Sequence, residues 1–180
     1  MRRVLLLVSI VALITNVGYT KTQEAEPAKQ VRAGDVVPFG ETLFVRASKA
    51  TNTFEGIKVK GEPLVVVLEM ESGKKGVTLF YKLTADSGSS QIYLLSGAHK
   101  IAPSAVIEDF PSWGRDNDKE VDKLDPKDTV GGVTLSFQQK GSISLLFDVP
   151  VADAKAQKKL SVVMRMVQPK DEQQSFVVSL

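Results

Sequence analysis

Apolar and polar side chains alternate one by one along much of the chain after Gly34. The apolar positions of residues 42–48 are Leu43, Val45 and Ala47. Residues 77–84 repeat the pattern, with Val77, Leu79, Tyr81 and Leu83 in the apolar positions. Because successive side chains of a strand point to opposite faces, this period of two predicts β-strands.

Five further segments have the character of strands. Residues 64–70 (LVVVLEM) form a nearly continuous apolar run, which predicts a central strand covered on both sides. Residues 133–138 and 143–149 each alternate, and Lys140 and Gly141 lie between them, so we expect a β-hairpin in which the glycine supplies a positive φ. Residues 160–166 alternate as well, and residues 175–180 are a candidate last strand.

Turn residues separate these runs at several places. The turn signals are Ser72-Gly73, Asp86-Ser87-Gly88 and Gly131-Gly132. Helical propensity is confined to residues 152–159, which are enough for one or two turns after Pro150. The pattern therefore predicts an all-β sandwich of about eight antiparallel strands, with residues 104–129 as one enlarged loop.

The first twenty residues have the organisation of a signal peptide. Arg2 and Arg3 precede an apolar run over residues 4–14, and small or polar residues follow. The run is short for a membrane-spanning helix, which needs about 20 apolar residues, so an uncleaved anchor is the less favoured alternative. We expect a signal peptide at 1–20, a flexible polar lead at 21–33 and one domain at 34–180 in an exported protein, periplasmic or extracellular.

Charge and cysteine content exclude several classes of function. The chain has 23 basic and 21 acidic residues, and without Arg2 and Arg3 the balance is neutral. This balance lacks the basic excess that nucleic acid binding needs, and it gives no general attraction to anionic lipid. The chain has no cysteine, which excludes disulfides, thiolate catalysis, cysteine–zinc sites and a lipid-modified cysteine.

The order of motifs resembles a family of secreted bacterial immunoglobulin-like domains of unknown function that is related to a mycobacterial secreted immunogenic protein. The matching features are Gly34-Asp35-Val36 before a strand, the valine-rich strand 64–71, the turn Asp86-Ser87-Gly88, and Lys140-Gly141-Ser142 before Leu146-Phe147-Asp148-Val149-Pro150. The resemblance spans most of residues 34–167 and implies an immunoglobulin-like sandwich that acts as a binding or accessory module without catalytic residues. The chain departs from the family pattern in residues 104–129, and from antibody domains in lacking the cysteines that join their sheets.

Acidic residues alternate in residues 115–128 as calcium ligands would. The candidate ligands are Asp116, Asp118, Glu120 and Asp122. An EF-hand loop starting at Asp116 requires a glycine and a glutamate where Val121 and Lys127 stand. Basic residues are interleaved with the acids, so a solvated, salt-bridged loop is favoured over a metal site.

Phe110, Pro111 and Trp113 place large apolar side chains in the enlarged loop. Exposed aromatic residues of this kind are candidate anchors for a partner, and the alternative is a loop folded back onto one end of the sandwich. His99 is the only histidine, so a metal site with several histidine ligands cannot form within one chain.

These features predict an exported, non-enzymatic binding or accessory module, acting through protein–protein contact at the cell envelope. No catalytic residue and no cofactor are expected, and nucleic acid is not an expected partner. One alternative is a calcium- or carbohydrate-binding β-sandwich centred on the acidic loop and Trp113. A second alternative is an uncharacterised hydrolase.

Overall fold

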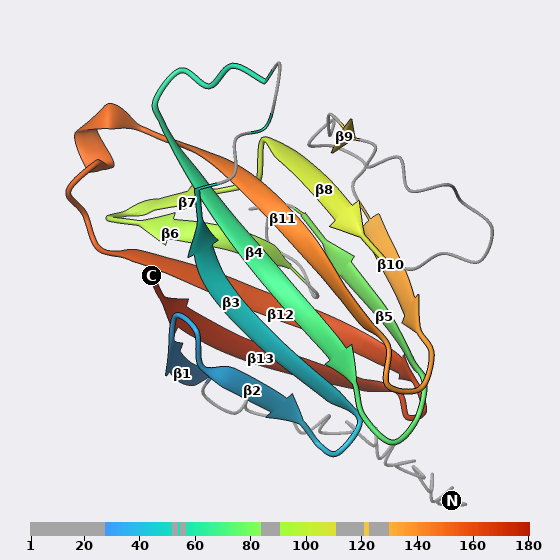
Figure 1. The fold of residues 1–180 in the computed structure, drawn as a ribbon. Coiled ribbons are helices and arrows are strands. Elements are labelled where there is room, and N and C mark those ends of the chain that lie inside the picture. The colour runs from blue at the N-terminus through green and yellow to red at the C-terminus, as the bar shows by residue number, and fades with distance from the viewer. Residues whose placement is uncertain (1–27, 52–53, 55–56, 84–90, 111–120, 123–129) are drawn as a thin grey trace, which may run out of the picture.

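The computed structural model describes residues 28–51, 54, 57–83, 91–110, 121–122 and 130–180, which form two β-sheets packed face to face (Figure 1). Sheet A is seven-stranded and has the order β1-β13-β12-β5-β10, with β6 pairing β12 and β7 pairing β6. Its strands are β1 (Lys29–Arg32), β5 (Val77–Lys82), β6 (Ile92–Ser96), β7 (His99–Ile101), β10 (Val130–Leu135), β12 (Lys158–Gln168) and β13 (Glu172–Ser179).

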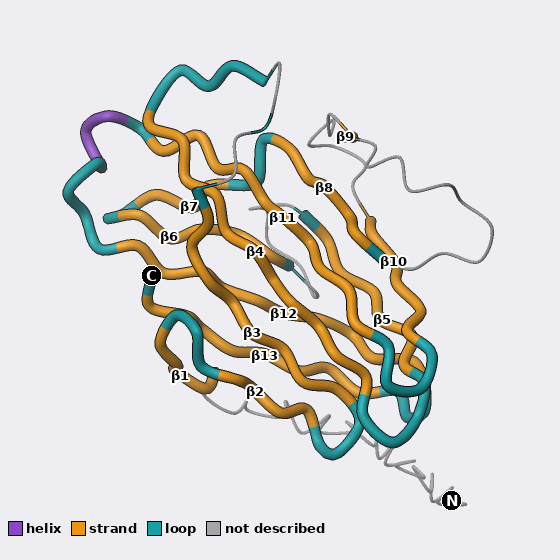
Figure 2. The backbone as a smooth tube through the Cα atoms, viewed as in Figure 1, coloured by secondary structure: helices purple, strands orange, loops and turns teal. Residues whose placement is uncertain are grey.

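Sheet B is six-stranded and has the order β2-β3-β4-β11-β8-β9. Its strands are β2 (Val36–Phe39), β3 (Leu43–Ala50), β4 (Glu62–Ser72), β8 (Ala105–Asp109), β9 (Val121–Asp122) and β11 (Lys140–Val149). Strand dominates the described chain, and one 3-10 turn, η1 (Val151–Asp153), is its helical element (Figure 2). No helix in the described ranges is long and apolar enough to span a membrane.

The strand order is that of an immunoglobulin fold. In that fold the strands A to G, lettered along the chain, form one sheet A-B-E-D and a second sheet C-F-G. Lettering β3, β4, β5, β8, β11, β12 and β13 from A to G gives β3-β4-β11-β8 in sheet B and β5-β12-β13 in sheet A, as observed. The predicted immunoglobulin-like sandwich is therefore confirmed. The strands outnumber the predicted eight because short strands such as β1, β2 and β9 are too brief to show a period.

The main core lies between the two sheets, where the alternating positions meet. Sheet A contributes the apolar residues of β5, β12 and β13, and sheet B those of β3, β4 and β11. Phe39 of sheet B and Phe176 of sheet A contact each other across the interface, with ring centroids 5.6 Å apart and ring planes tilted by 50°. All seven residues that the period-two pattern assigned to shared faces in 42–48 and 77–84 are buried.

A second, smaller cluster covers the outer face of sheet B. It consists of Phe54, Val65, Ala105 and Leu146, and Ile57 and Val59 pack against it. Phe54, Ile57 and Val59 belong to the connection between β3 and β4, which therefore folds back over the sheet. This cover explains why β4 is buried on both faces at Val65 and Val66, as its continuous apolar run predicted.

The predicted hairpin over 133–149 is wrong. The strands β10 and β11 are consecutive but lie in different sheets, because β10 pairs with β5 and β11 pairs with β4 and β8. Alternation shows that a side chain faces the core, but both sheets face the same core, so it does not assign the sheet. The residue with positive φ in the connecting turn is Gln138, at 54°, while Gly141 lies within β11.

Three other segments differ from the sequence expectations. Gly131 and Gly132 form part of β10, opposite Tyr81 and Phe80, instead of a turn. Residues 105–109 of the predicted loop form β8, and Lys29–Arg32 of the predicted lead form β1, parallel to β13. Short strands at a sheet edge can be held by backbone hydrogen bonds without alternating apolar residues. Their sequences therefore showed no clear period of two. The expected short helical stretch after Pro150 is present as the single 3-10 turn η1, and β12 begins at Lys158.

Candidate functional site

The described residues bring together a group of polar side chains at one end of the sandwich, which we call the hairpin–turn cluster: Ser96, His99, Asp153 and Lys158. Ser96 and His99 are opposite each other in the β6–β7 hairpin, and Ser96 is also opposite Lys158 of β12. Residues directly opposite in neighbouring strands share a face of the sheet. Lys158, Ser96 and His99 therefore form one row that points toward the sheet B side.

The hairpin that carries His99 depends on a two-residue turn. Gly97 occupies the first central position of that turn with φ of 58°. A positive φ at the first of two central residues is typical of a type II′ turn, which matches the twist of the paired strands. The glycine thus fixes the direction in which the hairpin presents His99.

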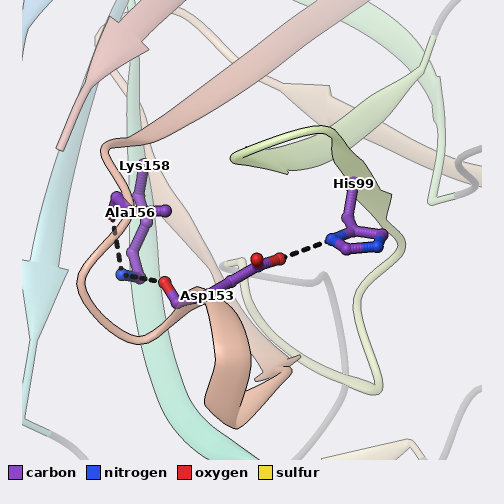
Figure 3. Close-up of polar contacts among 4 residues, drawn as sticks. All are labelled: His99, Asp153, Ala156 and Lys158. Atoms are coloured by element: carbon purple, nitrogen blue, oxygen red, sulfur yellow. Dashed lines mark hydrogen bonds and ion pairs between the residues drawn. The ribbon is translucent and has the colours of Figure 1, made fainter.

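Asp153 reaches the cluster from the connection that leads from sheet B to sheet A. The chain leaves β11 at Val149, and η1 closes with the Asp153 N–H donating to the Pro150 carbonyl at 2.8 Å. The Asp153 side chain then extends to His99, with Oδ2 at 2.6 Å from Nδ1 (Figure 3). The carboxylate side chain is 13% exposed and the imidazole 62% exposed, so a mostly covered acid holds a largely exposed histidine.

Lys158 supports the same connection from the opposite side. Its Nζ donates to three backbone carbonyls, those of Asp153 at 3.3 Å, Ala154 at 2.6 Å and Ala156 at 3.0 Å. Figure 3 shows Asp153 between His99 on one side and Lys158 on the other. These contacts join the β6–β7 hairpin, η1 and β12 into one unit.

With Ser96, the cluster contains the three residue types of a serine protease triad, but the Ser96 hydroxyl is not placed to act as the nucleophile. The Ser96 side chain is fully buried, and Oγ has no hydrogen-bond partner within the described part of the chain. A nucleophilic serine must lie within hydrogen-bond reach of the histidine that takes its proton. The His99–Asp153 pair therefore orients an imidazole without activating this hydroxyl.

A second polar contact links the two sheets away from the cluster. The phenol of Tyr81 in β5 donates to Oε1 of Glu108 in β8. Glu108 is opposite the buried Ile143, so its side chain starts from the inner side of sheet B. Burial of the phenol, followed by the hydrogen bond and negative charge of Glu108, raises the pKa of Tyr81 well above its usual range.

The structure describes only some of the candidate site residues that the sequence suggested. The candidate ligands Asp116, Asp118 and Glu120 lie outside the described residues, as do Pro111 and Trp113. Asp122 belongs to β9, where its backbone pairs with Val106.

Phe110 of the aromatic segment is described, and it packs within the protein. It is half-buried against the main core. A Cβ added at Gly141 would lie 2.1 Å from Phe110 Cδ1, so the ring occupies the space that the glycine leaves open.

No group of three histidine, aspartate or glutamate side chains in the described ranges is arranged to hold a metal ion. His99 and Asp153 are two potential ligands side by side, one fewer than the protein ligands of a catalytic zinc site. Sequence reasoning missed Asp153 and Lys158 because their contacts depend on the connection crossing between the sheets. The only local signal was Pro150 three residues before an aspartate, which is common in tight turns.

Comparisons with known proteins bear on the fold. No protein-family model and no curated protein matches the chain. Among solved structures, it is similar to an uncharacterised β-sandwich protein from Clostridium difficile at 9% identity and TM-score 0.41, over 88% of this chain and 97% of that one. It is also similar to the secreted protein MPT63 from Mycobacterium tuberculosis at 12% identity and TM-score 0.45, over 87% and 100%.

A third solved structure, the sporulation control protein Spo0M from Bacillus subtilis, matches at 11% identity and TM-score 0.34, over 77% of this chain and 50% of that one. At these identities the similarity is one of general β architecture and carries no residue roles. The function has to be argued from the side chains of this chain itself.

Proposed function

We propose that this chain is an exported, non-enzymatic binding or accessory module of the cell envelope. The sandwich supplies a rigid body with two outer faces and two ends, and such scaffolds commonly bind through surface loops, sheet faces or edges. The first twenty residues support export because they have the order of a signal peptide: basic residues, an apolar run, then small or polar residues.

The hydrogen bonding of the hairpin–turn cluster is the observation that supports a non-enzymatic function. The cluster is the place in the described chain where a serine, a histidine and an aspartate approach one another, and the serine hydroxyl is buried without a hydrogen bond. The aspartate and the lysine instead bind the hairpin and the turn backbone. The cluster has the contacts of a structural joint, which keeps one end of the module rigid.

A fluorophosphonate probe tests this assignment, because it labels serines that a neighbouring base activates. We expect no labelling of the purified full chain under conditions in which a known serine hydrolase is labelled completely. Labelling that disappears in both Ser96→Ala and His99→Gln would overturn the proposal and establish a hydrolase. Labelling that persists in Ser96→Ala would place an active serine elsewhere in the chain and would overturn it equally.

Export has a separate test. The protein recovered from periplasmic and culture fractions should begin near residue 21 when its N-terminus is sequenced. A protein that retains Met1 in the cytoplasmic fraction would contradict export.

A further inference from the structure

The outer face of sheet A carries a line of basic residues that runs across five strands. Following the register from β1 through β13, β12, β6 and β7, the opposed residues are Arg32, Ser179, Lys159, Leu95 and Lys100. The first, third and fifth positions are basic. We call this line the basic row.

The basic row faces away from the core. In β12 the buried residues Leu160, Val162 and Met164 alternate with Lys159 and Ser161, so Lys159 points outward. Opposed residues share a face, which places Arg32 and Lys100 on the same outer side as Lys159. Neighbouring strands lie about 4.8 Å apart, so successive charges of the row are about 10 Å apart in an extended line.

These cations have no acidic partners among the described residues. The Arg32 backbone N–H donates to the Asp35 carboxylate at 2.9 Å and its carbonyl accepts the Asp35 N–H at 3.1 Å, but no ion pair in the described ranges involves the Arg32 guanidinium. Lys100 Nζ lies over the Tyr93 ring, 5.1 Å from its centroid. No ion pair within the described ranges involves Lys159.

On the opposite face of the sandwich, outward cations are paired with carboxylates of neighbouring strands. The outward cations of the sheet B strands are each paired with a cross-strand carboxylate, Arg46 with Glu69 at 3.6 Å and Lys140 with Glu71 at 3.2 Å. Within the described ranges the basic row has no such pairing, and single exposed lysines without an ion pair, such as Lys58 and Lys60, lie elsewhere on the surface. Three aligned outward cations favour an extended anionic partner on sheet A.

The residues beside the basic row favour a polyhydroxylated partner. Ser179 lies in the row and the exposed Gln30 lies in the next line on the same outer face, and hydroxyl and amide groups exchange hydrogen bonds with hydroxyls. Leu95, the apolar residue within the row, is only partly exposed, and the exposed Phe80 of the same face lies opposite Arg165, six residues along β12 from Lys159. The row itself therefore offers a lipid surface no exposed large apolar anchor.

We propose that the basic row binds an acidic polysaccharide, with carboxylates of the sugar chain contacting Arg32, Lys159 and Lys100 in turn. This inference rests on the proposed function, because it names the partner of the binding module. At physiological ionic strength the Debye length is about 8 Å, slightly less than the spacing of the charges. Each cation therefore contributes separately, and binding weakens as salt is added.

Polygalacturonate is the test ligand, and its fully methyl-esterified form is the neutral control. Calorimetric titration of the full chain at low salt should show binding to polygalacturonate only. Lys100→Gln/Lys159→Gln should weaken this binding about tenfold, since each exposed ion pair contributes up to a few-fold. The matched variant Arg46→Gln/Lys140→Gln removes two cations from the opposite face and should stay within about twofold of the unmodified chain.

Each other outcome overturns the inference. Equal weakening in both double variants would mean that binding follows total charge and not the basic row. Polyglutamate binding as tightly as polygalacturonate would replace the sugar polymer by an acidic peptide, and tighter binding to phosphatidylglycerol vesicles would replace it by a lipid surface. Failure to bind any of these ligands would refute the polysaccharide while leaving the binding-module proposal intact, because the fluorophosphonate result does not depend on it.

Discussion

Asp148 shows how one side chain connects distant segments of this protein. It lies in β11 within the segment Leu146-Phe147-Asp148-Val149-Pro150 that resembles the immunoglobulin-like family. Its carboxylate accepts hydrogen bonds from the backbone N–H groups of Lys60 at 3.0 Å and Gly61 at 2.6 Å, immediately before β4 begins. Its neighbours Phe147 and Val149 are buried in the main core, and Leu146 belongs to the second cluster. The motif thus has a structural explanation that requires no shared function.

Replacing Asp148 with alanine should lower the free energy of unfolding by about 1–3 kcal/mol, because two backbone donors lose a charged acceptor. Urea denaturation of the two proteins measures the difference. Asp148→Asn, which keeps one carbonyl oxygen, should lose less. Equal stability of Asp148→Ala and the unmodified chain would show that water replaces both bonds without cost.

Tyr81 makes the stability of the fold sensitive to alkaline pH. Its raised pKa means that the folded chain keeps the phenolic proton when the unfolded chain, with an ordinary tyrosine pKa of about 10, releases it. The stabilisation is complete below about pH 10 and is lost as the pH rises above that value, by about 1.4 kcal/mol per pH unit.

We therefore expect Tyr81→Phe to show a shallower loss of stability between about pH 10 and 11 than the unmodified chain. Chemical denaturation at several pH values gives the two slopes. Glu108→Gln should retain part of the steeper slope, because burial is the leading cause of the shift and remains. Parallel curves for Tyr81→Phe and the unmodified chain would contradict this assignment.

At the scale of elements, the connection between β3 and β4 behaves as a cover for sheet B. Phe54 is 6% exposed in the second cluster, and the Ile57 N–H donates to the Phe54 carbonyl at 3.3 Å. The connection has no strand partner of its own in the described ranges. Its order should therefore depend on the burial of Phe54.

Phe54→Ala should cost about 2–4 kcal/mol and should speed amide exchange in residues 57–61 more than in the sheets. Hydrogen exchange followed by mass spectrometry separates these regions. Phe137→Ala is the matched control, since Phe137 is 60% exposed and its loss should cost less than about 0.5 kcal/mol. A similar effect of both substitutions would mean that the second cluster contributes nothing to stability.

The β10–β11 turn shows the limit of sequence reasoning at this scale. Ser72, a buried residue at the end of β4, accepts the Gln139 N–H on its hydroxyl at 2.9 Å and donates its own N–H to the Gln139 carbonyl at 2.9 Å. These contacts fix a turn that crosses between the sheets. The strands on both sides were predictable from alternation, but their separation into two sheets depends on residues far away in the chain.

Across the whole molecule, the two sheets share one core and should unfold together. The Phe39–Phe176 pair joins an edge of sheet B to sheet A. Phe176→Ala should lower stability by about 3–5 kcal/mol and should shift the far- and near-ultraviolet circular dichroism transitions equally. Two separated transitions in the variant would show that one sheet remains folded without the other.

The sequence by itself determined that strands dominate and which side chains face inward, and it predicts a signal peptide over residues 1–20. These properties depend on neighbouring residues, because period two and an apolar run are local patterns. Only the tertiary structure decided which sheet each strand joins, that Asp153 and Lys158 meet beside the β6–β7 hairpin, and that Arg32, Lys159 and Lys100 form one line across the outer face of sheet A. These properties depend on pairing between residues far apart in the chain. A balanced net charge does not show where the fold places the positive and the negative side chains.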